Sequence, residues 1–134
     1  QLVPQPLLRK APQKSKWGVI YYGSTTPAME ESFAQLAEKG LHFDGLRLRA
    51  YPFPASVRDF VLQHERVLVV EQNRDAQMRT LLIHEFDFNP AHVLPVLHYD
   101  GTPITARFIT SAIKGHLAAL DASPQTQPLS TEAL

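Results

Sequence analysis

Four consecutive aliphatic residues, Val67 to Val70, constrain the fold of this chain more than any other stretch. They lie in RVLVVEQN (Arg66–Asn73), where the apolar run stops at polar residues. An aliphatic run of this kind is typical of a strand that is covered on both faces, as in a parallel sheet. The sequence therefore predicts an α/β fold in which helices cover both sides of a sheet.

Strand-like and helix-like segments alternate four times along the chain. The expected strands are Trp17–Tyr22, Gly45–Tyr51, Arg66–Asn73 and His92–Gly101. The expected helices are Pro27–Lys39, Pro52–His64, Arg74–Glu85 and one that follows Thr105. Alternation of this kind predicts a mostly parallel sheet of four or five strands, joined by helices on both faces.

Local signals mark the ends of the helices. Thr26 is expected to cap the first helix, with Pro27 at its first position and Gly40 just beyond its end. Asn73 is one candidate cap for the third helix, in which Leu81 is expected to face inward.

The strands carry two informative features. Pro95 has no N–H to donate to a neighbour, so the last strand is expected at an edge of the sheet. Arg47 and Arg49 lie on the polar side of the second strand. They are either solvated or paired with acidic groups across an interface.

The chain divides into a central domain and two flanking segments. Residues 1–16 are expected to form an extended linker or an arm that adds an edge strand, through Leu2–Val3 or Leu7–Leu8. Residues 17–120 are expected to form the α/β domain. Residues 121–134 read as a polar tail without periodicity.

Composition excludes several functional classes. The formal net charge is zero, which argues against a nucleic-acid groove or a polybasic membrane surface. The absence of cysteine rules out disulfides, zinc thiolates and thiolate-bound iron–sulfur clusters within the chain. No apolar run approaches the roughly 20 residues that cross a bilayer, and no signal-peptide pattern is present. A cytoplasmic protein is therefore expected.

Three loops follow predicted strands and would meet at the carboxyl edge of a parallel sheet, where ligands bind in this class of fold. They are Gly23–Thr26, Glu71–Asn73 and Tyr99–Gly101. The first contains Ser24 and Thr25 before a helix start, as a phosphate-binding loop would. Pro27 removes one N–H donor from it, so a tight turn at Gly23 with a cap at Thr26 is the preferred interpretation. A small flavodoxin-like FMN-binding electron carrier is the alternative.

Glu71 is the most prominent ionisable residue in these loops. At the end of a buried strand, its carboxylate is a candidate general base, a hydrogen-bonding partner for another chain, or an anchor for nearby N–H groups. No second titrating partner is evident, so a structural role is favoured. The six histidines show no metal-ligand spacing, and no metal site is expected.

Several segments together carry a family resemblance: YYGSTTPAMEESFAQLAEKG, LRLRAYPFP, RVLVVEQNRDAQMRTLL and VLHYDGTPIT. In this order and spacing they resemble the C-terminal domain of the alpha subunit of 2-oxoacid:ferredoxin oxidoreductases, the 2-oxoglutarate and pyruvate synthase enzymes. The likeness covers about Trp17 to His116. Its sharpest marks are PFP (52–54), VVEQN with Gln77, and YDGTPIT (99–105).

The resemblance implies a three-layer α/β/α sandwich similar to the C-terminal domain of transketolase, with an added antiparallel strand. The complete enzyme would oxidatively decarboxylate a 2-oxoacid to an acyl-CoA, using thiamine diphosphate, Mg, iron–sulfur clusters and coenzyme A, and would reduce ferredoxin. This chain would be its inactive terminal domain and would bind none of these cofactors. Its partners would be the other alpha-subunit domains and the beta subunit, with no nucleic acid and no membrane.

The resemblance carries over to few individual residues. Gly23, Ser24 and Thr25, with Glu71, Gln72 and Asn73, match the family's strand-end loops and are expected to lie at an interface or behind the active-site entrance. Asp100 and Gly101 match a structural turn, and Gly101 is expected to need a positive φ. No catalytic residue is expected.

Overall fold

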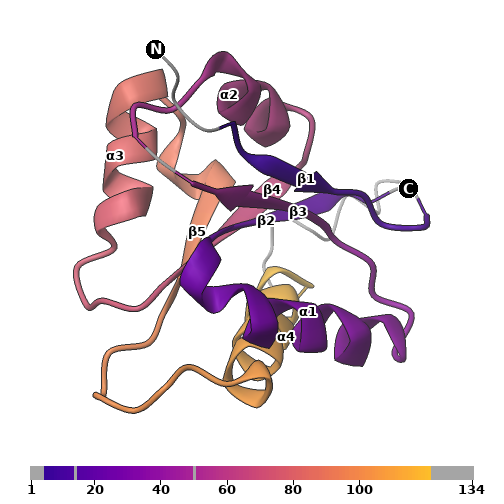
Figure 1. Cartoon of the computed structure of the whole chain (residues 1–134). Coiled ribbons are helices and arrows are strands. Elements are labelled where there is room, and N and C mark those ends of the chain that lie inside the picture. The colour runs from indigo at the N-terminus through magenta and orange to yellow at the C-terminus, as the bar shows by residue number, and fades with distance from the viewer. Residues whose placement is uncertain (1–4, 14, 50, 122–134) are drawn as a thin grey trace.

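The computed structural model describes residues 5–13, 15–49 and 51–121. Five strands and four α-helices are present in this part of the chain, with two short 3₁₀ turns (Figure 1). In order they are β1 (Leu7–Arg9), β2 (Trp17–Tyr22), η1 (Gly23–Thr25), α1 (Thr26–Ala37), β3 (Asp44–Leu48), α2 (Ala55–Leu62), β4 (Arg66–Glu71), α3 (Gln77–Phe86), η2 (Pro90–His92), β5 (Val93–Leu97) and α4 (Ala106–Asp121).

The strands form one mixed sheet in the order β1-β3-β2-β4-β5. Only β1 is antiparallel to its neighbour, and the four others run parallel. The chain leaves β2 toward one side of the sheet, through α1 to β3. It then returns through α2 to β4 on the other side of β2. The strand order therefore reverses direction between β2 and β4, at the centre of the sheet.

Two apolar cores fill the space between the sheet and its helices. One contains Ile20 and Val69 and packs under α2 and α3, while the other contains Val19 and Leu68 and packs under α1 and α4. Figure 1 shows the two helix pairs on opposite faces of the sheet. Because adjacent residues of β2 and β4 face opposite cores, both strands are apolar throughout, as the Val67–Val70 run predicted.

Two glycines allow helices to approach the sheet closely. A Cβ at Gly18 would lie 2.7 Å from the ring of Phe60, and one at Gly45 would lie 2.9 Å from the ring of Phe33. Both glycines lie on strands, so the missing side chains make room for an aromatic ring from α2 on one face and from α1 on the other.

A buried acid–histidine pair ties β3 to α2 and to the N-terminal arm. Asp44 Oδ2 lies 2.8 Å from His64 Nε2, and His64 Nδ1 lies 2.7 Å from the carbonyl oxygen of Phe60. The N–H of Ala11 donates to Asp44 Oδ1 at 2.8 Å. Both ring nitrogens of His64 therefore lie within hydrogen-bond distance of an oxygen atom.

The two sheet edges differ. The outer edge of β1 is short, with Leu7 and Leu8 exposed. On β5, Pro95 has no N–H, and its carbonyl oxygen lies 2.7 Å from His116 Nε2 of α4. The expected edge position of Pro95 is confirmed, as is an edge strand at Leu7–Leu8. Leu2–Val3 and the residues after Asp121 lie outside the described part of the chain.

Several local predictions are confirmed. Gly40 has φ +78 just after α1, and the N–H of Leu41 bonds back to the carbonyl oxygen of Leu36 at 3.0 Å, which closes the helix. Gly101 has φ +88, the left-handed conformation expected of it.

Three predictions about local structure are wrong. Thr26 does not cap α1, because the turn η1 extends the helical path back to Gly23 and places Thr26 inside it. The third helix begins at Gln77, three residues later than expected. Leu81, which was expected to face inward, is 44% exposed, whereas Met78 and Leu82 enter the core.

Gly18→Ala is expected to lower the free energy of unfolding by about 1–3 kcal/mol, because the added methyl group would overlap the buried ring of Phe60. Gly115→Ala is the matched control. Gly115 lies in α4 with open space around it, so alanine there should stabilise the helix by up to about 1 kcal/mol. Urea unfolding measures both changes. Equal effects of the two substitutions would contradict the close approach at Gly18.

The Asp44–His64 pair predicts a pH-dependent stability. Burial raises the pKa of Asp44, but the Ala11 N–H, His64 and Lys10 together hold that pKa below its usual value of 3.8. A depressed folded pKa means that the stabilisation is complete above the unfolded pKa and is lost as the pH falls through the folded one. We expect Asp44→Asn to cost about 2–4 kcal/mol at neutral pH. Below about pH 4 the stability of the variant should fall less steeply than that of the wild type. Parallel stability profiles in urea would rule this out.

Candidate functional site

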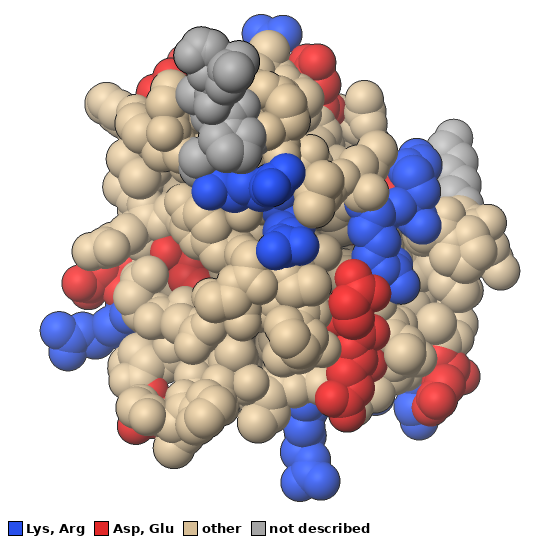
Figure 2. Space-filling view, viewed as in Figure 1, with Lys and Arg blue, Asp and Glu red and all other residues tan. Residues whose placement is uncertain are grey.

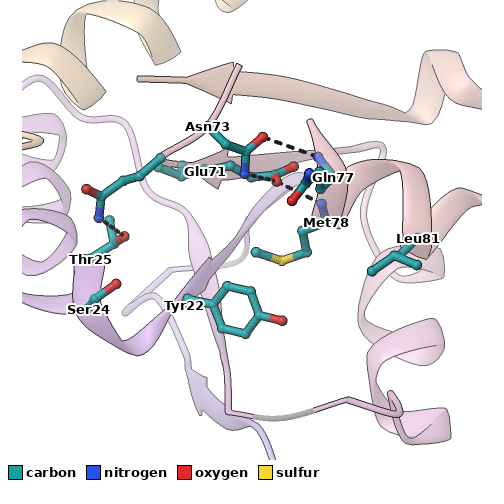
Figure 3. Close-up of a pocket in the computed structure, with 10 residues that line it drawn as sticks. Tyr22, Ser24, Thr25, Glu71, Asn73, Gln77, Met78 and Leu81 are labelled. Carbon is teal, nitrogen blue, oxygen red and sulfur yellow. Dashed lines mark hydrogen bonds between the residues drawn. The ribbon is translucent and has the colours of Figure 1, made fainter. Parts of the chain in front are cut away.

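A crevice of about 290 Å³ opens at the carboxyl edge of the sheet, between the ends of β2 and β4. This is the point at which the strand order reverses. Ligands of open α/β sheets bind at such a point, because the loops after the two strands lead to opposite faces and leave a gap between them. Figure 3 shows the side chains that line it, which are Tyr22, Ser24, Thr25, Val70, Glu71, Gln72, Asn73, Gln77, Met78 and Leu81.

The β2 side of the crevice is formed by Tyr22 and the turn η1. Thr25 is buried, and its Oγ1 accepts a hydrogen bond from Gln72 Nε2 at 3.3 Å, which joins the loops after β2 and β4 (Figure 3). Ser24 is exposed at the rim. No side chain in the described part of the chain caps the turn, and the Thr26 hydroxyl is buried without a hydrogen-bond partner there.

Glu71 organises the β4 side. It is 4% exposed, and three donors reach its carboxylate. Oε1 accepts from the N–H of Met78 at 2.7 Å and from Asn73 Nδ2 at 3.0 Å, while Oε2 accepts from the N–H of Arg79 at 2.8 Å. The acid therefore binds the first N–H groups of α3, where a negative charge also interacts favourably with the helix dipole. Of the three roles considered for Glu71, this geometry favours the anchor for nearby N–H groups.

Asn73 supports the same helix start. Its Oδ1 accepts from the N–H of Asp75 at 3.1 Å and of Gln77 at 3.4 Å. The prediction that Asn73 is itself the cap is wrong, because α3 starts later and Ala76 occupies the N-cap position. The residue before α3 is Ala76, which has a left-handed φ of 51°. A left-handed alanine is unusual, and here two anchored neighbours on the loop and the helix surround it.

The crevice is electronegative. Among its described lining residues, Glu71 is the one with a formal charge. Burial raises the pKa of the Tyr22 hydroxyl, and the negative charge of Glu71 raises that pKa further. Two nearby arginines are engaged elsewhere: Arg74 Nε lies 3.6 Å from Asp75 Oδ1, and Arg79 Nε donates to the carbonyl oxygen of Val93 at 2.6 Å.

A second polar feature lies on the opposite face of the sheet, beside Gly23. The Arg47 guanidinium packs against this glycine, whose Cβ would lie 3.0 Å from Nη2. Arg47 Nε is buried without a hydrogen-bond partner among the described residues. A tight 3₁₀ turn does begin at Gly23, without a positive φ, and the missing side chain also makes room for Arg47.

The third predicted loop stays apart from the crevice. Asp100 Oδ1 accepts from the N–H of Thr102 at 3.0 Å and from its hydroxyl at 2.6 Å, and lies 3.3 Å from His98 Nε2. The hydrogen bonds from Thr102 lower the pKa of Asp100, and the nearby His98 contributes to the same shift. These contacts suit a structural turn.

Five of the six strand-end residues singled out from the sequence line one crevice: Ser24, Thr25, Glu71, Gln72 and Asn73. Three further lining residues, Tyr22, Gln77 and Leu81, were not predicted as part of this site. Tyr22 ends an apolar strand directly before Gly23, and that position was the available signal. Gln77 was expected inside α3 and not at its start, and Leu81 was expected in the core.

Two classes of site find no support in the described residues. No group of three or more potential metal ligands occurs among them. No helix in this part of the chain is both long and apolar enough to cross a membrane.

Comparisons with known proteins now place the fold. No protein-family model matches the chain, and no curated protein matches its sequence. Among solved structures, 2-oxoglutarate:ferredoxin oxidoreductase from Magnetococcus marinus, with 2-oxoglutarate, coenzyme A and succinyl-CoA bound, superposes with a TM-score of 0.71 at 22% identity. The match covers 85% of this chain and 20% of that chain, so this chain spans about a fifth of its length.

A second match is the alpha chain of a probable 2-oxoacid ferredoxin oxidoreductase from Thermoplasma acidophilum, with a TM-score of 0.57 and 22% identity, covering 85% of this chain and 97% of that one. These likenesses establish the fold. The chain has the mostly parallel α/β architecture that the sequence resemblance implied. Nothing in the turn geometry or the matches favours the flavodoxin-like alternative.

Glu71→Gln is expected to destabilise the protein by about 2–3 kcal/mol, because an amide offers one acceptor oxygen where the carboxylate binds two buried backbone N–H groups. Hydrogen exchange should become faster at the amides of Met78 and Arg79 before it changes elsewhere. Glu85→Gln, the same change at an exposed position of α3, is the control and should change stability by less than about 0.5 kcal/mol. Unchanged exchange at the start of α3 in Glu71→Gln would refute the anchoring role.

Proposed function

We propose that this chain is the C-terminal domain of the alpha subunit of a thiamine-diphosphate-dependent 2-oxoacid:ferredoxin oxidoreductase. In this role it forms subunit and domain interfaces and lends loops to the active-site entrance, while the chemistry takes place elsewhere in a cytoplasmic complex. The observation that carries the proposal is the TM-score of 0.71 over 85% of the chain. The ordered motifs at residues 52–54, 69–77 and 99–105 point to the same family.

The residues present do not suit the cofactors of the complete enzyme. Iron–sulfur clusters need thiolate ligands, and the chain has no cysteine. The one crevice at the sheet reversal holds a buried carboxylate and no cationic lining residue in the described part, which opposes a diphosphate. These groups belong to other domains in this proposal, and so does the choice of 2-oxoacid.

What the chain offers instead is a rigid edge with polar loops. Glu71 and Asn73 hold the start of α3, and the Gln72–Thr25 hydrogen bond holds the two loops together. On the face shown in Figure 2, most of the surface is uncharged and the charged side chains are dispersed. Such a surface suits the contacts between domains of one assembly, which are more polar than a core.

Affinity purification from the source cells tests this proposal. The tagged full-length protein that contains this chain should copurify with iron–sulfur polypeptides and with 2-oxoacid-dependent, coenzyme A-dependent reduction of a viologen dye. The isolated chain should be colourless and inactive with thiamine diphosphate and Mg²⁺ added. Turnover by this chain alone, or a yellow flavoprotein spectrum, would overturn the proposal.

A further inference from the structure

The crevice between β2 and α3 has a definite charge and shape that specify what enters it. Resting on the function proposed above, we infer that it receives the cationic side chain, lysine or arginine, of an adjoining part of the enzyme. The inference names the chemistry of the group that contacts this edge.

The charge of Glu71 favours a cationic group in the crevice. The three donors to Glu71 are uncharged N–H groups, so they hold the carboxylate in place without cancelling its charge. The field of Glu71 reaches the opposite wall, where it contributes to the raised pKa of Tyr22. A cation entering between these walls is attracted, and an anion is repelled, more strongly than in bulk water.

The shape of the crevice favours a long side chain with an apolar stem. One wall is apolar, with Met78 buried and Leu81 44% exposed. Lysine and arginine have an apolar stem below a charged head, and they bury the stem along apolar surface. The volume of about 290 Å³ is at the small end for ligand pockets and is suited to one long side chain. Leu81 would be covered by the stem, which accounts for its exposure here.

The rim of the crevice offers hydrogen-bond acceptors to a cationic head. Ammonium and guanidinium groups are pure donors, with three and five N–H groups respectively. The rim supplies acceptors, namely the Ser24 hydroxyl and the amide oxygens of Gln72 and Gln77, all on exposed residues. Figure 3 shows Thr25 on one side of the opening and Gln77 with Leu81 on the other. Gln72 lies on the side of Thr25, to which its Nε2 donates. A cationic head between them can therefore be satisfied from both loops.

A partner's side chain is the occupant that fits, because the crevice is open at an edge rather than enclosed. The matched unit makes up 20% of the Magnetococcus marinus chain, so most of that protein lies beyond the matched domain and supplies neighbours to it. An arginine or lysine from such a neighbour would enter with its charged head leading and its apolar stem lying along Leu81 of α3.

The test uses the isolated chain and n-propylguanidinium chloride, which reproduces an arginine side chain. Titration is followed by ¹H–¹⁵N NMR at matched ionic strength. Saturable shifts are expected at the amides of Thr25, Gln72 and Met78. N-propylurea, a neutral probe of the same shape, should bind about fivefold more weakly, and butyrate should not bind. Equal binding of the three probes, or no saturable shift, would overturn the inference.

Two substitutions at exposed Gln77 add a charge test without touching the bonds to Glu71. Gln77→Glu should tighten propylguanidinium binding about threefold, and Gln77→Lys should weaken it at least as much. Circular dichroism should show both variants folded. The same affinity in both variants would contradict a cation site. Failure of the probes in a chain that still copurifies with oxidoreductase subunits would reject this inference alone. Probe binding without copurification would reject the enzyme partner together with the proposed function.

Discussion

The start of helix α3 depends on one buried acid. Glu71 ends β4, and its two carboxylate oxygens accept hydrogen bonds from the N–H groups of Met78 and Arg79. Helix starts expose N–H groups that must find acceptors, and here the acceptor comes from the sheet itself. The interaction fixes the distance between β4 and α3, and with it the width of the crevice. The same carboxylate then determines the sign of the charge inside that crevice, so one residue links the stability of the edge to its binding preference.

The sequence predicted the layers of this fold well because burial on both faces leaves an unmistakable mark. Val67–Val70 predicted β4, an interior strand, because a strand covered on both faces is apolar throughout. Pro95 predicted the edge strand β5, because proline has no N–H to donate to a neighbour. Helix starts were predicted less well. Thr26 and Arg74 looked like beginnings, but a 3₁₀ turn moved the first start upstream and the side chains of Glu71 and Asn73 moved the third downstream. At the start of α3 the deciding hydrogen bonds join side chains to N–H groups four to eight residues ahead, and simple capping patterns do not include this spacing.

Two oppositely charged side chains lie toward opposite faces of the sheet. On the side of α3, the crevice holds the Glu71 carboxylate. On the side of α1, the Arg47 guanidinium lies against Gly23 with a buried Nε that lacks a partner among the described residues. Sequence analysis placed the arginines of this strand on a polar surface and left open whether acids pair with them. The Glu71 carboxylate and the Arg47 guanidinium thus lie toward opposite faces of the sheet, although the chain is neutral overall.

The contrast between the two borders of the sheet bears on how the protein avoids uncontrolled self-association. A bare strand invites any other extended chain to pair with it. On β5, Pro95 has no N–H, and its carbonyl oxygen already bonds to His116. An incoming strand would find few free backbone groups to pair with there. β1 has three residues, Leu7 and Leu8 among them are exposed, and no strand in the described part of the chain pairs with its outer edge. A further strand could therefore be added to the sheet beside β1 but not beside β5.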